Sequence, residues 1–442
     1  MAGSVFDSAL YRDLFPTGDT GRLFTDNAEI RSLMLVEGAL AKVQGDLGVI
    51  PEVSAAAIHR ASLELQIDPS ALAGSTGQNG VSVPGLVAAF REAMQAPEHA
   101  QFLHWGATSQ DIIDTGLMLR LRQVLAAQEE DIRAVLAQLA TLAAKHAETP
   151  MTARTWGQHA TPMSFGSLVA QWGCPLLVLA RDLESLRQNT LMVSLSGAAG
   201  TSSALGTKAT DTRSALADAL GLQDPGRSWH TDRTPVLRIA DWMVRCGIAL
   251  GKMGEDLTEL SMSGISEISF GGGASSTMPQ KQNPVAPSSI VALARHATGQ
   301  NAVLQQAGLA RHQRDGAAWM CEWMALPQLA LATSAALEIA TRLTAWLEPH
   351  GARMARSVDD PLGLIHAEAL SFALADALGR PKAQAVTKTL CKEAAATGTS
   401  LIELAVKQYP ELDPAAFSAN YQMGMSAQAA QQFADQVRAL QV

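Results

Sequence analysis

The stretch TGLMLRLRQVLAAQEEDIRAVLAQLATLAAKHAE, residues 115–148, decides the fold class of this chain. It contains no proline, and its single glycine lies at its start. Over residues 132–142 the apolar side chains recur at the spacing of one helix face. A helix of this length is typical of a bundle rather than of a compact α/β domain. Residues 237–267 and 317–347 follow the same pattern, with a kink expected at Pro327. We therefore expect an all-α fold.

Breaks in the helical pattern divide the 442 residues into three parts. Pro150 ends the first long helix, and Pro349-His350-Gly351 forms the clearest late boundary. We expect three domains: an N-terminal helical domain over residues 1–110, a central helical bundle over 111–350 and a C-terminal helical domain over 351–442.

Composition limits the kind of partner that this chain can have. Charged residues make up 17% and hydrophobic residues 47%, which is typical of a folded soluble protein. The net charge of −9 argues against a nucleic-acid surface, so positive charge that meets an anionic substrate must be local. The four cysteines lack metal-binding spacing and favour reduced thiols in the cytoplasm. We expect no signal peptide, and no apolar run long enough to span a membrane.

Two polar segments flank the first long helix. In His104-Trp105-Gly106-Ala107-Thr108-Ser109-Gln110-Asp111, the hydroxyls of Thr108 and Ser109 suit a carboxylate at a helix start. Simple capping of the helix is the alternative interpretation. In Arg154-Thr155-Trp156-Gly157-Gln158-His159-Ala160-Thr161-Pro162, the polar neighbours of His159 suit a polyanion, although a lone histidine is more often structural.

A third segment combines flexibility with polar groups. It reads Gly271-Gly272-Gly273-Ala274-Ser275-Ser276-Thr277-Met278-Pro279-Gln280-Lys281-Gln282-Asn283-Pro284. Two hydroxyls, a lysine and an asparagine suit a small anion. A flexible linker is the alternative, but the two X-Pro pairs are too stiff and specific for one. We expect a mobile lid over residues 268–284.

Together the three segments resemble the signature regions of the fumarase/aspartase superfamily, in the expected order. The resemblance covers nearly the whole chain, and the third segment is its most specific part. It implies an all-α subunit with a central bundle of long helices, a homotetramer whose active sites are shared between subunits, and no metal or organic cofactor. It also implies chemistry that passes through an aci-carboxylate intermediate.

The second segment resembles one branch of the superfamily. Lyases of adenylosuccinate and argininosuccinate carry Thr-His where this chain has Thr155-Trp156, with His159 three residues further on. This pattern and residues 312–319 are similar to the cycloisomerases of bacterial protocatechuate breakdown. The resemblance therefore implies a small tricarboxylate substrate, a carboxylated muconate, that closes to a lactone without release of fumarate.

The resemblance also implies roles for individual residues. Ser275 is the first candidate for the proton donor to carbon, and His159 is the rival general acid. Lys281 and Asn283 would hold the carboxylate that becomes the aci form. Substrate-binding roles fall to His104, Thr108, Ser109, Arg154, Trp156, Gln158, Ser276 and Arg314, with weaker support for His230. One departure is Ala274, which stands where the superfamily usually has glycine, at a cost of roughly 1 kcal/mol if φ is positive.

Three other functions stay open at this point. An adenylosuccinate-type lyase would release fumarate, and Trp156 argues against it. A non-catalytic structural member of the superfamily would be expected to have lost Ser275, Lys281 and Asn283, which are present. A metal-dependent muconate cycloisomerase on a barrel would need strands and carboxylate ligands. The stereochemistry of addition and the tolerance of substituted muconates are left open.

Overall fold

The computed structural model describes residues 3–271, 273, 278 and 281–440. Helices dominate it, which confirms the all-α prediction. Its contacts group into two compact units. Unit 1 comprises residues 1–131, 179–248 and 292–339, and unit 2 comprises residues 132–178, 249–291 and 340–442. The unit boundaries fall inside five long helices: α7 (Ser109–Lys145), α8 (Phe165–Thr190), α10 (Thr234–Leu260), α11 (Val285–Ala307) and α12 (Gly316–Ala345).

The three predicted long helices correspond to α7, α10 and α12. The first begins at Ser109, six residues before the expected start, because the polar segment in front of it supplies its own capping bonds. Helix α12 continues through Pro327, which lies inside it. The expectation that no run could span a membrane needs correction. Among the described residues, α12 is long and apolar enough, but 72% of its most apolar window is buried inside the protein, as in a core helix.

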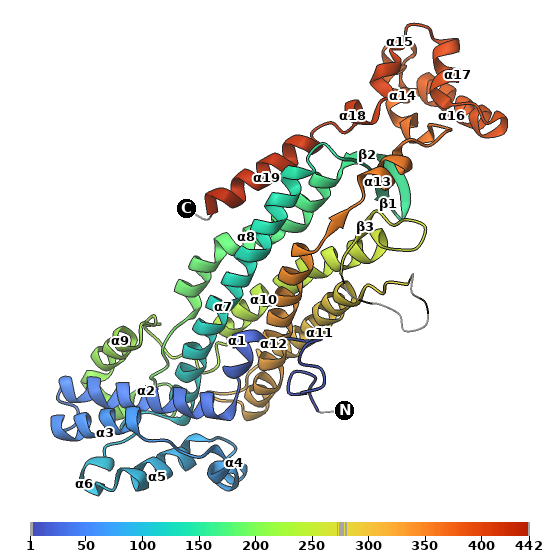
Figure 1. Ribbon diagram of the computed structural model, residues 1–442. Helices are drawn as coiled ribbons and strands as arrows, with labels where there is room; N and C mark the ends of the chain where they lie inside the picture. The colour runs from blue at the N-terminus through green and yellow to red at the C-terminus, as the bar shows by residue number, and fades with distance from the viewer. Residues whose placement is uncertain (1–2, 272, 274–277, 279–280, 441–442) are drawn as a thin grey trace. The chain divides into compact units, whose positions relative to one another are not determined.

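The remaining elements of unit 1 are shorter than these five helices. They are α1 (Gly18–Arg22), α2 (Asp26–Asp46), α3 (Glu52–Glu64), η1 (Pro69–Leu72), α4 (Ala73–Asn79), α5 (Val83–Met94), α6 (Pro97–Ala100), η2 (Ser203–Lys208) and α9 (Ala209–Leu220). Helices α2 and α3 lie side by side (Figure 1). The N-terminus of α2 is capped by Thr25, whose side chain accepts from the backbone N–H of Ala28. In the same unit, the buried indole of Trp229 donates to the carbonyl of Val193.

Unit 2 contains the strands, which the sequence analysis did not predict. They are β1 (Pro150–Thr155) with β2 (Gln158–Ser164), and β3 (Ile268–Ser269) with β4 (Glu348–Pro349), each pair antiparallel. The β1–β2 hairpin follows α7 directly and carries the whole second polar segment. Too few residues alternate in it for a period-2 pattern to stand out.

The C-terminal part of unit 2 is helical. The elements are α13 (Gly351–Val358), η3 (Leu364–His366), α14 (Ala367–Ala373), α15 (Ala375–Leu378), α16 (Arg380–Thr397), α17 (Leu401–Gln408), η4 (Pro414–Phe417), α18 (Ala419–Gln422) and α19 (Ser426–Leu440). Helices α14 to α17 lie together (Figure 1) around a small core, whereas α13 packs on β1. Leu370, Leu390 and Leu401 are buried together at the centre of this core. Helix α19 instead packs on α8, where a Cβ at Gly173 would lie 2.1 Å from the Phe433 ring. The three-domain division stays a prediction.

Candidate active site

The start of helix α7 is built by a reciprocal pair of bonds. The backbone N–H of Thr108 donates to Oδ2 of Asp111 at 3.0 Å, and the backbone N–H of Asp111 donates to the carbonyl of Thr108 at 2.9 Å. The first of these is one of the two bonds of a capping box, the one in which the side chain at the third helical position accepts from the capping residue. The Thr108 hydroxyl accepts no backbone N–H of the helix among the described residues, so it can bind another group. Ser109, the first helical residue, lies where unpaired N–H groups and the helix dipole favour an anion.

Asp111 is fully buried and is the most heavily bonded carboxylate of this region. Its two oxygens accept five hydrogen bonds of 2.8–3.0 Å, from Thr108 N, Ser194 Oγ, Ser196 N, Gly197 N and His230 Nε2. Asp111 therefore fixes the helix start, the 194–197 loop and His230 to one another.

His230 has one nitrogen committed and one not. Its Nε2 lies 2.8 Å from Asp111, whereas its Nδ1 is buried without a hydrogen-bond partner among the described residues. In the tautomer that carries its proton on Nε2, that nitrogen donates to Asp111 and Nδ1 is an acceptor. His230 and Arg314 both line a small cavity of about 10 Å³. His230 therefore connects Asp111 to the residues around this cavity.

Arg314 joins this group from a segment 206 residues away. Its Nε donates to Gln110 Oε1 at 2.9 Å, and its Nη2 donates to the hydroxyl of Thr108 and the carbonyl of Ala198, each at 3.2 Å. The side chain is exposed, and its Nη1 makes no hydrogen bond within the described part of the chain. The predicted substrate-binding residues Thr108 and Arg314 are thus brought together, with a guanidinium that can still receive a carboxylate.

Behind Arg314 lies a buried ion cluster that holds three helices together. The Arg233 guanidinium makes bidentate pairs with Asp114 of α7, at 2.8 and 3.0 Å, and with Glu322 of α12, at 2.7 and 2.9 Å. Burial raises the pKa of Glu322, Arg233 opposes this effect, and Asp114 adds to it. Arg233 directly precedes α10, so the cluster connects α7, α10 and α12 beneath the candidate site.

His104 has an uncommon backbone and a strong partner. Its φ is +65°, in the left-handed region, and its Nδ1 lies 2.6 Å from Oε1 of the buried Glu37. Burial opposes protonation of His104, but the Glu37 carboxylate outweighs it and raises the pKa of the imidazole. The pair with Glu37 fixes the position of the imidazole in the segment that leads into α7.

The second polar segment forms a tight hairpin in unit 2. Trp156 and Gly157, with φ of +55° and +71°, make its two-residue turn, which is the geometry of a type I′ turn. Trp156 is 102% exposed, and the flanking Gln158 and His159 are exposed as well. A tryptophan at positive φ is strained by about 1–3 kcal/mol, and such strain is typical of functional sites. The hairpin therefore presents its predicted residues outward from the unit.

Arg154 has a structural partner instead of a free guanidinium. It forms a bidentate pair with Glu267, at 2.7 and 2.8 Å, and Ser357 donates to the same carboxylate at 2.9 Å. Glu267 is buried, so loss of Arg154 would strand a buried charge. In this structure the Arg154 guanidinium is occupied, and a substrate carboxylate would have to displace Glu267 to bind it.

The third segment is described only at its ends. Ser275, Ser276 and Ala274 lie outside the described residues. The backbone N–H of Asn283 donates to the carbonyl of Gly273 at 2.9 Å, which closes the loop at its base. Gly273 has φ of +73°, and a Cβ there would lie 2.0 Å from the carbonyl oxygen of Asn283, so only glycine fits. Lys281 is exposed on the same loop.

Sequence reasoning missed two functional candidates, Asp111 and Gln110, and gave His230 only weak support. The spacing Thr-x-x-Asp at a helix start was a usable signal, because it is the pattern of a reciprocal cap. No comparable local signal ties His230 to Asp111, since 119 residues separate them. The other predicted residues divide between the units. His104, Thr108, Ser109 and Arg314 belong to unit 1, and Arg154, Trp156, Gln158, His159, Lys281 and Asn283 belong to unit 2.

Known proteins resemble this chain over most of its length. A family described as lyase matches residues 20–299. A 3-carboxy-cis,cis-muconate cycloisomerase of Pseudomonas aeruginosa is 36% identical, over 87% of this chain and 85% of its own length. The crystal structure of a 3-carboxy-cis,cis-muconate lactonizing enzyme from Pseudomonas putida superposes with a TM-score of 0.90 at 31% identity, and covers 98% of this chain and 100% of its own.

A second solved structure widens the comparison to fumarate chemistry. A fumarate lyase from Mesorhizobium sp. BNC1 superposes with a TM-score of 0.86 at 30% identity, and covers 98% of this chain and 99% of its own. The family match alone spans more than half of the 442 residues. This chain therefore belongs to the lyase family, the fumarase/aspartase superfamily that its three polar segments resemble.

Proposed function

We propose that this protein is a cofactor-independent cycloisomerase that converts 3-carboxy-cis,cis-muconate to 4-carboxymuconolactone, in cytoplasmic protocatechuate breakdown. The observation that carries the proposal is the 36% identity to the Pseudomonas aeruginosa cycloisomerase over 87% of this chain. The candidate site is consistent with it, since the site offers separate donors for a substrate with several carboxylates.

The reaction is an internal addition in which the ionised substrate takes up one proton and no other atom is added or lost. One carboxylate oxygen of the substrate forms a C–O bond to a carbon of a C=C double bond and closes a five-membered lactone. The electron pair of the double bond moves toward a second carboxylate, which becomes a doubly negative aci-carboxylate. A proton from the protein then bonds to the carbon next to that group. Donors aimed at the aci-carboxylate should matter most, and loss of one typically costs on the order of 10²–10³-fold in rate.

Unit 1 supplies an anchor for one substrate carboxylate. Arg314 is held by Gln110 and Thr108 and keeps donors for an anion, and the start of α7 adds the hydroxyl of Ser109 and a favourable dipole. His104, held by Glu37, lies in the segment that leads into this helix. Asp111 and His230 do not need to touch the substrate for this role, because they hold Thr108 in place.

The remaining groups come from unit 2. Lys281 and Asn283 would bind the aci-carboxylate, and the proton would come from Ser275 or His159. We propose that the active protein is a homotetramer with sites shared between subunits. The fully exposed Trp156 supports this, because a large aromatic side chain that is strained and bare in one chain is expected to bury its ring against another.

A turnover assay tests the proposal. Purified protein is mixed with 3-carboxy-cis,cis-muconate, the loss of its ultraviolet absorption is followed, and the product is identified by NMR. EDTA in the buffer should change nothing. Arg314→Met should lower kcat/KM by about 10–150-fold, the equivalent of 1.5–3 kcal/mol for a hydrogen bond to a charged group. Arg311→Met is the matched control, because Arg311 is exposed and paired with Asp315 at 2.7 Å. If protein shown to be folded by circular dichroism forms no lactone, the assignment is refuted.

Release of fumarate is the second candidate function, favoured by the similarity to the Mesorhizobium fumarate lyase. The two reactions share the aci-carboxylate but differ in the leaving group, which stays attached in the cycloisomerase. Adenylosuccinate and argininosuccinate are suitable probes, with fumarate measured as product. Fumarate release at rates comparable to lactone formation would favour the lyase.

A further inference from the structure

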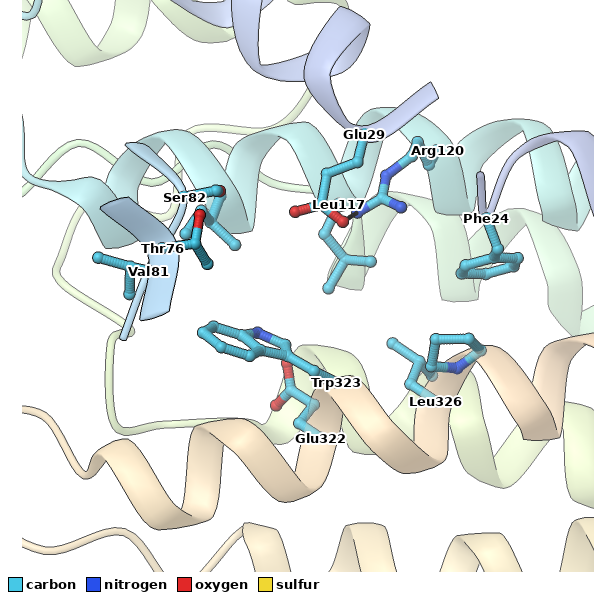
Figure 2. Close-up of a pocket in the computed structure, with 12 residues that line it drawn as sticks. Phe24, Glu29, Thr76, Val81, Ser82, Leu117, Arg120, Glu322, Trp323 and Leu326 are labelled. Atoms are coloured by element: carbon cyan, nitrogen blue, oxygen red, sulfur yellow. Dashed lines mark ion pairs between the residues drawn. The ribbon is translucent and has the colours of Figure 1, made fainter. Parts of the chain in front are cut away.

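A cavity of about 310 Å³ lies inside unit 1, apart from every residue predicted to bind the substrate. Helix α7 and the start of α2 form one wall, α12 forms the opposite wall, and the turn between α4 and α5 closes one end (Figure 2). This volume is at the lower end of the range for ligand pockets, and suits a molecule built around a single ring.

Arg120 gives the cavity an unsatisfied positive charge. The residue is only 8% exposed, yet its guanidinium has two long contacts, 3.4 Å from Nη1 to the carbonyl of Leu23 and 3.8 Å from Nη2 to Glu29. Its Nε is buried without a hydrogen-bond partner among the described residues. Burial lowers the pKa of Arg120, and Glu29 offsets this only in part. A buried guanidinium with such weak partners is costly, and a well-placed anion would remove the cost.

The opposite wall is mainly apolar, and its one carboxylate, Glu322, is paired with Arg233. Trp323 and Leu326 of α12 face Leu117 and Arg120 across the cavity (Figure 2). Phe24 lies at the same end as Arg120, whose Cζ is 5.9 Å from the ring centroid. Trp323 and Leu117 offer apolar faces to a planar ring. An offset or edge-to-face contact with an indole adds roughly 0.5–1.5 kcal/mol beyond burial. Inorganic anions lack this apolar body, and a long acyl chain exceeds the volume.

We propose that this cavity binds a small aromatic carboxylate, with its carboxylate on Arg120 and its ring between Trp323 and Leu117. Glu29 acts as an internal competitor. Its side chain is 39% exposed and its carboxylate lies 3.8 Å from Arg120, so an incoming carboxylate can displace it toward solvent. The dashed line in Figure 2 marks this pair. The site goes beyond the proposed function, because none of the residues assigned to lactone formation lines it.

Calorimetric titration of the full-length protein with benzoate tests the proposal. Benzyl alcohol keeps the ring without the charge, and acetate keeps the charge without the ring. Benzoate should bind once per chain, and both controls should bind at least about tenfold more weakly. Arg120→Met should weaken benzoate binding at least about tenfold, whereas Glu29→Gln should strengthen it severalfold. Arg314→Met is the matched control and should leave benzoate binding unchanged.

The outcomes separate this site from the proposed active site. The proposal is overturned if benzoate does not bind, if Arg314→Met abolishes binding, or if Glu29→Gln weakens it. The Glu29 side chain is partly exposed, so Glu29→Gln is expected to fold. Its effect on benzoate binding therefore tests the proposal even if Arg120→Met does not fold. Because the titration needs no turnover, a negative result leaves the cycloisomerase assignment standing. A protein that binds benzoate but makes no lactone contradicts only the proposed function.

Discussion

Asp111→Asn is the sharpest perturbation of the candidate site, because it changes one atom in a group with five donors. Asparagine can keep one oxygen in place of Oδ1 and so retain the bonds from Ser194, Ser196 and His230. Its amide nitrogen then replaces Oδ2 and faces the backbone N–H groups of Thr108 and Gly197. The flipped amide, with its nitrogen in place of Oδ1, would leave three donors without an acceptor instead of two and is less favourable.

The cost follows from these two stranded donors. A buried donor that loses its acceptor costs about 1–3 kcal/mol, so Asp111→Asn should lower the free energy of unfolding by about 2–6 kcal/mol. His230 also loses a charged partner. Ser194→Ala is the graded control, because it removes a single donor and should cost roughly 1 kcal/mol. Thermal unfolding followed by circular dichroism measures both, and turnover measured well below the melting temperature reports the effect on Thr108 and Arg314.

The two readouts together test the physical reasoning. Asp111→Asn should lower both Tm and kcat/KM, and Ser194→Ala should lower Tm only slightly. A double-mutant cycle of Asp111→Asn with His230→Ala should give a coupling energy of at least about 1 kcal/mol. An Asp111→Asn variant with an unchanged Tm and full turnover would refute the view that Asp111 holds the site together.

Three further predictions concern other parts of the chain. Lys281→Ala should abolish lactone formation while the oligomer measured by light scattering persists; near-normal turnover would contradict its role. Trp156→Asn should stabilise the hairpin by about 1 kcal/mol, because asparagine tolerates positive φ, yet lower kcat/KM. Burial raises the pKa of Asp131 to about 6. The folded protein thus keeps a proton that the unfolded chain loses near 3.8, so stability falls as pH rises between these values. Asp131→Asn should therefore raise Tm at pH 7 but not at pH 3.5, where equal shifts would contradict this.

The long helices could be predicted because their signal is local and repeated. Residues 115–148 combine helical periodicity with an absence of proline, and α7 covers most of them. The start of α7 was harder, because it depends on Asp111 reaching back to Thr108 rather than on periodicity. The hairpin of the second segment was missed because its turn contains tryptophan at a position where the usual turn signal is Asn-Gly.

Most residues of the candidate site could be predicted from the sequence, but most of their hydrogen-bond and ion-pair partners could not. Thr108 was indicated by its place before a helix and by the resemblance, and Arg314 by the resemblance alone. The structure brings Arg314 Nη2 within 3.2 Å of the Thr108 hydroxyl. Neither composition nor spacing reveals that Arg154 pairs with Glu267, because 113 residues separate them. From the sequence alone, the Arg154 guanidinium suits a substrate carboxylate as well as a protein carboxylate. Long-range partners of this kind depend on the packing of the unit. The roles of the loop residues stay predictions, with Ser275 and Ser276 outside the described residues.

Two residues of the predicted site, His104 and Trp156, share a property that sequence rules treat as unfavourable. Both have positive φ, and both stand beside or near a glycine that could have taken that conformation at lower cost. Natural sequences keep such strain where the side chain is needed in that position. At His104 the strained backbone delivers the imidazole to Glu37, and at Trp156 it delivers an indole to the outside of the hairpin. Positive φ is not confined to these two segments, because Gln95, Ser202, Ser266 and His312 also have it. At His104 and Trp156 it coincides with segments that the resemblance identifies, and there it orients a side chain of the predicted site.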